Sequence, residues 1–343
     1  MNDRAADRRP TDDRPTTPDV AVVMATYRRP DLLSRCLEAL RVQTLDGRRF
    51  EIVVADDDAG SPGAATTRAI VDALHASTHG APAVRYVPVT KTQGPAGARN
   101  AGWQATSARV IAFTDDDTVP DPGWIEAGLA ALDAGLDAAG GAIRMPLPAV
   151  PTDYERDAAG LAHAEFATAN CFVVRPALVA VGGFDERFTA AWREDSDLQF
   201  ALMKAGYRVG FADRAVMVHP VRPAPFGVSV GQQRKVVFDV LLFKKHPELY
   251  RTRILPTPPW AYYACVGALG GAVVAAAAGA GTVAAGLAAV WGALTLRFAW
   301  SRLRGTSRRL SHVAEMLWTS VAIPPLALWW RLVGALRYRV VYL

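Results

Sequence analysis

Apolar runs alternate with amphipathic segments through the first half of the chain. Short, mainly apolar runs occur at residues 20–25, 51–55, 84–87 and 109–113, each with at most one charged residue, and runs of this length predict buried strands. The segments between them carry leucine, isoleucine and valine at helical spacing, as in the stretch 31–44. Strands that alternate with helices predict an α/β fold with a mostly parallel central sheet.

The pattern is less regular beyond residue 138. We expect strands at 172–174 and 208–211, and a helix at 196–205 that is preceded by Glu194 and Asp195. These elements extend the α/β domain over residues 19–250. The tail at 1–18 has mixed charges and no apolar segment, so it is predicted to be disordered. It also lacks the features of a signal peptide, which places the domain on the cytoplasmic side.

The last third of the chain has a different character. The 43 residues from Ile254 to Leu296 include no charged side chain, and a helical membrane crossing needs about 20 residues. Gly279 and Gly281 lie near the middle of this stretch and predict a turn. We therefore expect a membrane hairpin at about 258–296. The alternative is an alanine-rich hairpin outside the membrane.

A third apolar segment at about 313–335 is rich in tryptophan and contains Pro324-Pro325. We expect the proline pair to break the helix, which indicates an interfacial or third membrane segment. Arginines follow the hairpin from Arg297 onward. By the positive-inside rule they lie in the cytoplasm, so residues 251–343 are predicted to attach the α/β domain to the cytoplasmic membrane.

Composition narrows the class of protein. The chain is 51% hydrophobic and 21% charged, with a mean hydropathy of +0.10, which excludes a disordered or fibrous chain. Its net charge of +5 is uneven, because residues 251–343 contain ten arginines and a single acidic residue, Glu315. A basic balance confined to the apolar region indicates membrane lipids as partners and argues against nucleic acid.

Two of the predicted strands end in runs of aspartate. Asp56, Asp57 and Asp58 follow the second strand, and residues 115–117 follow the fourth. Ligands bind at the carboxyl edge of such sheets, and clustered carboxylates need a cation or a hydrogen-bonded ligand. Mg²⁺ and Mn²⁺ prefer oxygen ligands of this kind. Neither the Gly-rich dinucleotide-binding motif nor the P-loop motif follows any of these strands, which argues against a Rossmann dehydrogenase and a P-loop NTPase.

Six segments of the chain, in this order, resemble the family 2 glycosyltransferases, which are inverting enzymes of the GT-A fold. They are VMATYRRPDLLSRCLEAL, EIVVADDDA, GPAGARNAG, IAFTDDD, GGFDERF and REDSDLQFALMKAG. The C-terminal region is similar to that of bacterial membrane-associated members. The resemblance, over about residues 20–245, implies a Rossmann-like GT-A domain. It also implies transfer of a sugar from a nucleoside diphosphate donor to a hydroxyl of a glycan or lipid-linked acceptor, such as a cell-envelope polysaccharide.

The resemblance also implies roles for individual residues. Asp117, with His219, binds Mg²⁺ or Mn²⁺, and Asp195 is the general base, with Glu194 beside it. The residues expected to bind the nucleotide sugar are Thr26, Tyr27, Asp57, Arg99, Asn100, Asp115 and Asp116. Asp56 and Asp58 are alternatives to Asp57, and Asp197 is expected to serve as a helix cap.

Some alternatives stay open. The aspartates at 115–117 could cap a helix, Tyr27 could be an ordinary strand-end aromatic, Arg99 could form a surface salt bridge and His219 could be structural. A metal-dependent nucleotidyltransferase, or an inactive membrane scaffold, is the alternative function. Arg234 is followed by Lys235 where processive synthases carry tryptophan, so a single transfer is favoured.

Overall fold

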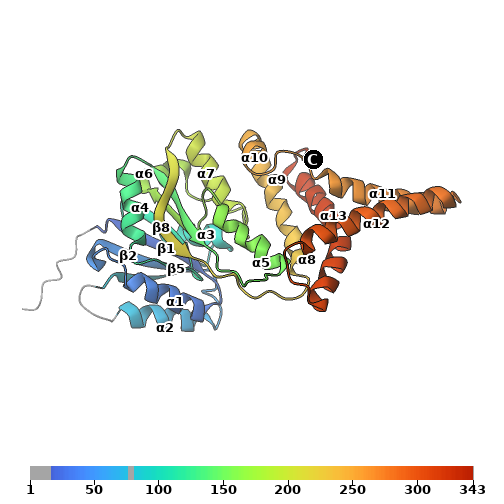
Figure 1. The fold of residues 1–343 in the computed structure, drawn as a ribbon. Helices are drawn as coiled ribbons and strands as arrows, with labels where there is room; N and C mark the ends of the chain where they lie inside the picture. Colours follow the sequence, from blue (N-terminus) through green and yellow to red (C-terminus); the bar gives the residue numbers. More distant parts are fainter. Residues whose placement is uncertain (1–16, 76–80, 343) are drawn as a thin grey trace, which may run out of the picture.

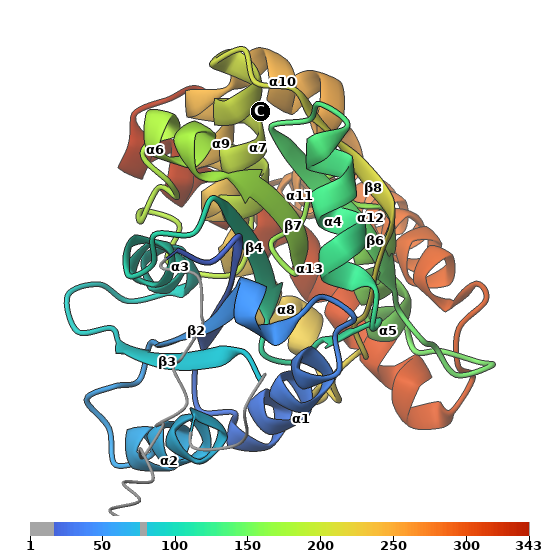
Figure 2. The ribbon, with the colours of Figure 1, turned by 90° about the vertical axis from the view of Figure 1, so that its left-hand side faces the viewer.

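The computed structural model describes residues 17–75 and 81–342. Residues 1–16 of the predicted disordered tail lie outside this range. Eight strands form one sheet in the order β3-β2-β1-β4-β7-β6-β8-β5 (Figures 1 and 2). The strands are β1 (Val20–Thr26), β2 (Phe50–Asp56), β3 (Ala83–Pro88), β4 (Val110–Asp115), β5 (Val119–Pro120), β6 (Ala138–Arg144), β7 (Asn170–Val174) and β8 (Val209–Val218).

Six of these strands run in one direction, and β7 and the short β5 run opposite to them. The predicted, mostly parallel α/β sheet is therefore confirmed. β1 lies between β2 and β4, with Thr26 opposite Asp56 and Ala25 opposite Asp115. The two runs of aspartate consequently leave the sheet at the same edge.

Helices cover both faces of the sheet. One apolar cluster joins it to α1, α2 and α4, and a second joins its other face to α3, α6 and α7. The helices of this domain are α1 (Pro30–Arg41), α2 (Ala64–His75), α3 (Pro95–Gln104), α4 (Trp124–Asp133), α5 (Asp153–Ala158), α6 (Arg175–Val181), α7 (Glu194–Lys204), α8 (Val228–Gln232), α9 (Val236–Lys245) and α10 (Pro247–Arg253). Short 3₁₀ turns are η1 (Gly47–Arg49), η2 (Ala159–His163) and η3 (Gln233–Lys235).

Three further helices follow: α11 (Trp260–Ala277), α12 (Gly281–Leu303) and α13 (Leu310–Tyr338). All three are long and apolar enough to cross a membrane. α11 and α12 pair as the predicted hairpin, and Gly279 adopts a positive φ of 74° in the turn. Figure 1 shows this hairpin extending away from the sheet domain. α13 instead packs against α9 through a third apolar cluster.

The expected break at Pro324-Pro325 is wrong, because α13 continues through both prolines. Proline removes a backbone donor but does not forbid a helix whose neighbours hold it in place. Pro324 is buried, and it lies next to Ile323, which is 4% exposed. Packing against the adjacent helices therefore maintains α13 over 29 residues.

Candidate active site

Three side chains meet at the acidic edge of the sheet. Asp115 ends β4, Asp117 lies in the turn that follows, and His219 comes directly after β8. Pairing of Val119 in β5 with Val218 in β8 brings His219 back to this turn. The potential ligand atoms of Asp115, Asp117 and His219 all lie within 4.8 Å of one another.

The chemistry of this group fits a divalent cation. His219 Nε2 lies 3.5 Å from Asp117 Oδ1. Asp117 Oδ2 is buried and has no hydrogen-bond partner among the described residues, although Arg222 Nε lies 3.0 Å from it. A buried carboxylate oxygen without a hydrogen bond is costly. Two carboxylates and an imidazole form a donor set that Mn²⁺ or Mg²⁺ accepts.

Asp116 points away from this group. It accepts hydrogen bonds from Thr26 Oγ1 at 2.8 Å and from Arg29 Nη1 at 3.1 Å. Burial raises the pKa of Asp116 to about 6, although Arg29 opposes the rise. Thr26 is 2% exposed and its hydroxyl is engaged with Asp116. Thr26 and Asp116 therefore support the turn after β4. Their expected contact with the nucleotide sugar stays a prediction.

The second aspartate run contains one carboxylate with an unused oxygen. Asp56 accepts from the Tyr86 hydroxyl at 2.9 Å, and Asp58 accepts from Arg28 and Ser61. Asp57 Oδ2 accepts from the Gly94 amide at 2.8 Å, but Asp57 Oδ1 is buried without a partner among the described residues. Burial raises the pKa of this carboxyl, and the Gly94 amide partly offsets the rise. Asp57 is thus available to accept from a ligand.

Tyr27 follows β1 beside this run. Its side chain is 38% exposed, and the Arg28 guanidinium lies 4.9 Å from the centre of its ring. The exposed ring is accessible to a planar ligand.

Arg99 links Asp115, at the acidic edge of the sheet, to Glu194 at the start of α7. Its Nη2 donates to Asp115 Oδ1 at 2.6 Å and its Nη1 donates to Glu194 Oε1 at 3.0 Å. Burial opposes ionisation of Asp115, but the charge and hydrogen bond of Arg99, together with the charges of His219 and Arg29, outweigh it and lower the pKa of that carboxyl. Arg99 is 2% exposed, so it forms an internal bridge and not the surface salt bridge that the sequence left open. Its expected contact with the nucleotide sugar stays a prediction.

Asn100 is turned away from the site. Its Nδ2 donates to the Phe184 carbonyl and to Glu186, each at 2.9 Å. Its Oδ1 accepts from the Phe184 amide at 2.9 Å and from Trp103 Nε1 at 3.0 Å. The amide group is engaged in holding the 182–186 loop, and its expected contact with the nucleotide sugar stays a prediction.

We expect Asn100→Ala to lower the free energy of unfolding by about 1–3 kcal/mol, because buried partners such as Trp103 Nε1 and the Phe184 amide lose their hydrogen bonds. Chemical denaturation measures this loss. Gln104→Ala, at an exposed position of the same helix, is the matched control and should change stability little. Equal effects of the two substitutions would contradict this role of Asn100.

Glu194 and Asp195 are the first two residues of α7. Glu194 is 3% exposed, while Asp195 keeps partial exposure and accepts from the Ser196 amide at 2.6 Å. Burial raises the pKa of both carboxyls. Asp197 is paired with Lys245 and His246 at 2.6 and 3.0 Å, so it ties α7 to the junction between α9 and α10.

Sequence reasoning missed Asp239, which holds the segment before Asp195. Asp239 accepts from Arg193 Nε at 2.8 Å and from Trp192 Nε1 at 3.0 Å. Arg193 has a positive φ of 73°, a costly conformation for a residue with a side chain. The buried pair with Asp239 stabilises it, and no local pattern in the sequence links these positions.

Arg29 and Arg222 were also not predicted as site residues, although their positions along the chain offered a signal. Each lies close along the chain to a predicted site residue, Arg29 to Tyr27 and Arg222 to His219. Both carry positive charge to the aspartates that follow β4.

Two models of known families match the chain. The model of "Glycosyl transferase family 2" matches residues 21–171. That of "Glycosyl transferase family group 2" matches residues 153–334, just over half of the chain. Together the two matches span the sheet domain and most of the C-terminal helices.

Individual relatives carry similar descriptions. "Glycosyltransferase AglE" of Haloferax volcanii is 26% identical over 64% of this chain and 72% of its own length. "Succinoglycan biosynthesis protein ExoO" of Rhizobium meliloti is 40% identical over 30% of this chain and 27% of its own. A solved structure, the mannosyltransferase PcManGT from Pyrobaculum calidifontis in complex with GDP-Man and Mn²⁺, shares the fold. It is 20% identical, with a TM-score of 0.53 over 94% of this chain and 91% of that one.

Proposed function

Since the chain belongs to glycosyltransferase family 2, we propose that it transfers a sugar from a nucleoside diphosphate donor to an acceptor hydroxyl with inversion at the anomeric carbon. The observation that carries this proposal is the group of Asp115, Asp117 and His219 at the carboxyl edge of the sheet. Arg99 joins that group to Glu194, the neighbour of Asp195. This bridge supports the proposal that Asp195 acts beside the metal-ligand group.

Mg²⁺ or Mn²⁺ would be held by Asp115, Asp117 and His219, and it would supply positive charge to the diphosphate leaving group. The solved mannosyltransferase of the same fold contains Mn²⁺ and GDP-Man, which supports this assignment. Arg222 lies beside Asp117, with its side chain 47% exposed. Its guanidinium adds positive charge where the diphosphate binds.

The nucleobase would bind beside β2. The unused Asp57 Oδ1 accepts an N–H group of the base, and the exposed Tyr27 ring packs against its face. A carboxylate oxygen without another partner discriminates strongly in favour of a base that donates to it, because a mismatched base would leave that oxygen unpaired.

Asp195 would remove the proton from the acceptor hydroxyl as that oxygen attacks the anomeric carbon. A general base must be ionised and within reach of the hydroxyl. The raised pKa of Asp195, which burial causes, makes it a stronger base than an exposed aspartate. Arg99 pairs with Glu194, so the adjacent Asp195 would be available to take the proton of the acceptor hydroxyl.

The acceptor would be lipid-linked or delivered at the membrane, with the catalytic domain on the cytoplasmic side. Three apolar helices follow the catalytic domain, and residues 251–343 carry ten arginines. Arginines flanking membrane helices favour the cytoplasmic face and anionic lipid headgroups.

A thermal-shift panel with UDP, GDP, dTDP and CDP, each with Mn²⁺ or with EDTA, tests the donor site. A nucleotide at about 100 times its dissociation constant adds roughly 2.7 kcal/mol to the free energy of unfolding. We expect one nucleotide to stabilise the detergent-solubilised protein when Mn²⁺ is present. Absence of any metal-dependent shift would instead favour the scaffold alternative.

A further inference from the structure

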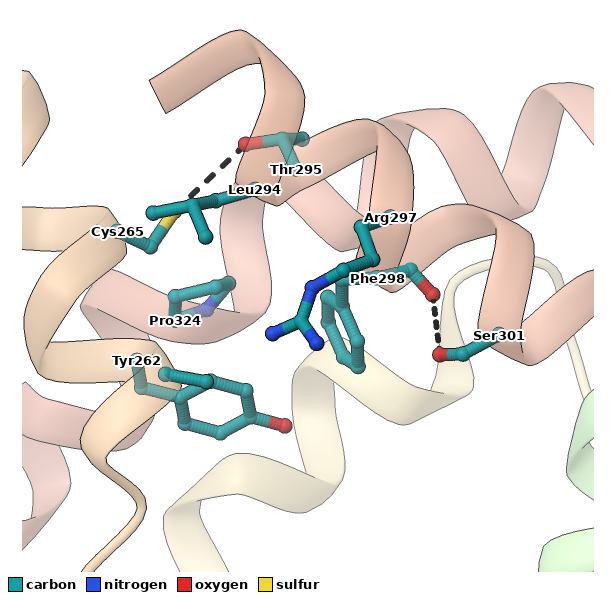
Figure 3. A pocket seen from close by; sticks show the side chains of 9 residues that line it. Tyr262, Cys265, Leu294, Thr295, Arg297, Phe298, Ser301 and Pro324 are labelled. Atoms are coloured by element: carbon teal, nitrogen blue, oxygen red, sulfur yellow. Dashed lines mark hydrogen bonds between the residues drawn. The ribbon is translucent and has the colours of Figure 1, made fainter. Parts of the chain in front are cut away.

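A cavity lies at the base of the α11–α12 hairpin, well removed from the acidic edge of the sheet. It has a volume of about 160 Å³ and is formed by α11, α12 and one residue of α13, Pro324 (Figure 3). Its polar lining comes from Tyr262, Thr295, Arg297 and Ser301. The remaining lining is apolar. The proposed transfer reaction does not use this cavity.

Arg297 is the charged group of the cavity. Figure 3 shows its guanidinium directed toward Tyr262, Phe298 and Pro324. The side chain is exposed, and no carboxylate in the described part of the chain forms an ion pair with it. Glu315, the single acidic residue after position 250, is engaged by the Gly227 amide at 2.7 Å. The guanidinium is therefore available to an external anion.

A second arginine increases the positive charge of this region. Arg331 on α13 is 9% exposed, and its Nε and Nη1 have no hydrogen-bond partner among the described residues. Arg302, one turn beyond Arg297, is paired with Asp153 at 2.8 Å. The helix bundle thus holds more cations than carboxylates, and its field favours an anion at the cavity.

The position of Arg297 along the chain indicates where this anion comes from. Arg297 directly follows the 43 uncharged residues that end at Leu296. Trp260 and Trp300 lie at the same end of the hairpin and are 60% and 58% exposed, as interfacial tryptophans are. In a membrane-inserted hairpin Arg297 would lie at the level of the lipid headgroups.

We propose that this cavity binds the phosphate headgroup of a membrane phospholipid. Arg297 donates to the phosphate oxygens, for which its planar fork is suited. The lipid chains lie along the exposed apolar surface of α11 and α12, where Val273 and Val290 are 63% and 51% exposed. A soluble anion would gain nothing from that apolar surface, which favours a lipid.

Lipid binding to the full detergent-purified chain, counted by native mass spectrometry, tests the proposal. The probes are phosphatidylglycerol, diacylglycerol with the same chains, and inorganic phosphate. We expect one phosphatidylglycerol to bind with an affinity that Arg297→Gln lowers about tenfold or more and Arg297→Lys lowers less. The matched control is Arg309→Gln, which removes the same charge at another exposed position and should leave the affinity unchanged.

Two results would overturn the assignment. Equal affinity for diacylglycerol and phosphatidylglycerol would mean that the cavity does not recognise phosphate. Equal competition by inorganic phosphate would mean that the lipid chains contribute nothing.

The inference rests on the membrane attachment in the proposed function, but not on sugar transfer. Vesicle flotation separates the two failures. A chain that does not float with phosphatidylglycerol vesicles contradicts the attachment itself. A chain that floats, but binds lipid equally with and without Arg297, contradicts only this site.

Discussion

Asp195→Asn is expected to lower kcat by about 10²–10⁴-fold, the contribution of a positioned general base. Asparagine keeps the size of the side chain but cannot accept the proton of the acceptor hydroxyl. Donor binding should stay close to that of the unmodified protein, because Arg99 is paired with Glu194 and Asp115 and not with Asp195. The kcat of transfer and the dissociation constant of the nucleotide are the two quantities to measure.

Asp213→Asn is a suitable control, because Asp213 is an exposed aspartate in the β8 segment that precedes His219. It should leave kcat and donor affinity unchanged. If Asp195→Asn weakened donor binding as much as it lowered kcat, Asp195 would be part of the donor site and another residue would be the base.

Asp117→Asn should remove the metal-dependent part of donor binding. Asp117 belongs to the candidate metal-ligand group, and its buried Oδ2 has no hydrogen-bond partner among the described residues. At a nucleotide concentration about 100 times the dissociation constant, loss of the metal site would remove roughly 2.7 kcal/mol of stabilisation by ligand. Unfolding of both proteins with nucleotide, with and without Mn²⁺, measures the difference.

The unliganded Asp117→Asn protein should be at least as stable as the original. Replacing the buried carboxylate by a neutral amide removes the cost of burying its charge, which offsets the loss of the contacts with Arg222 and His219. Asp116→Asn provides the comparison, because Asp116 is engaged by Thr26 and Arg29 and should retain a metal-dependent shift. Retention of the full shift in Asp117→Asn would place the metal elsewhere.

The strands that carry the site could be predicted because they are short runs of mainly apolar residues. β1, β2, β3 and β4 were each expected to within two residues, and their parallel order brings both aspartate runs to one edge. The position of this edge follows from the apolar pattern of the strands, which is a local property of the sequence.

β6 and β8 show where such reasoning fails. β6 has the sequence AAGGAIR, and alanine and glycine have low intrinsic preference for strands. Pairing with β7 on one side and β8 on the other holds it. β8 was expected only at 208–211 because Asp213 and Arg214 interrupt it, and the structure accommodates them in a register shift opposite Gly141 and Ala142.

The residues of the candidate site likewise fall into those that local motifs predict and those whose contacts are distant in the sequence. Asp115, Asp117, His219 and Asp195 were expected from motifs in the chain, and the first three meet in the structure. The bridge made by Arg99 and the support given by Asp239 were not expected, because their partners are 95 and 46 residues away. The hydrogen bonds between Asn100 and the 182–186 loop were not expected for the same reason.

The central claim is that Asp115, Asp117 and His219 hold the metal of a nucleotide-sugar site. Anomalous diffraction from crystals of the protein with Mn²⁺ and the nucleotide that stabilises it most tests this directly. The account predicts one ordered Mn²⁺ in contact with Asp117, with the nucleotide diphosphate beside it and the base near Asp57. Nucleotide bound at this edge with no Mn²⁺ at Asp117, or Mn²⁺ and nucleotide ordered only elsewhere, would contradict it.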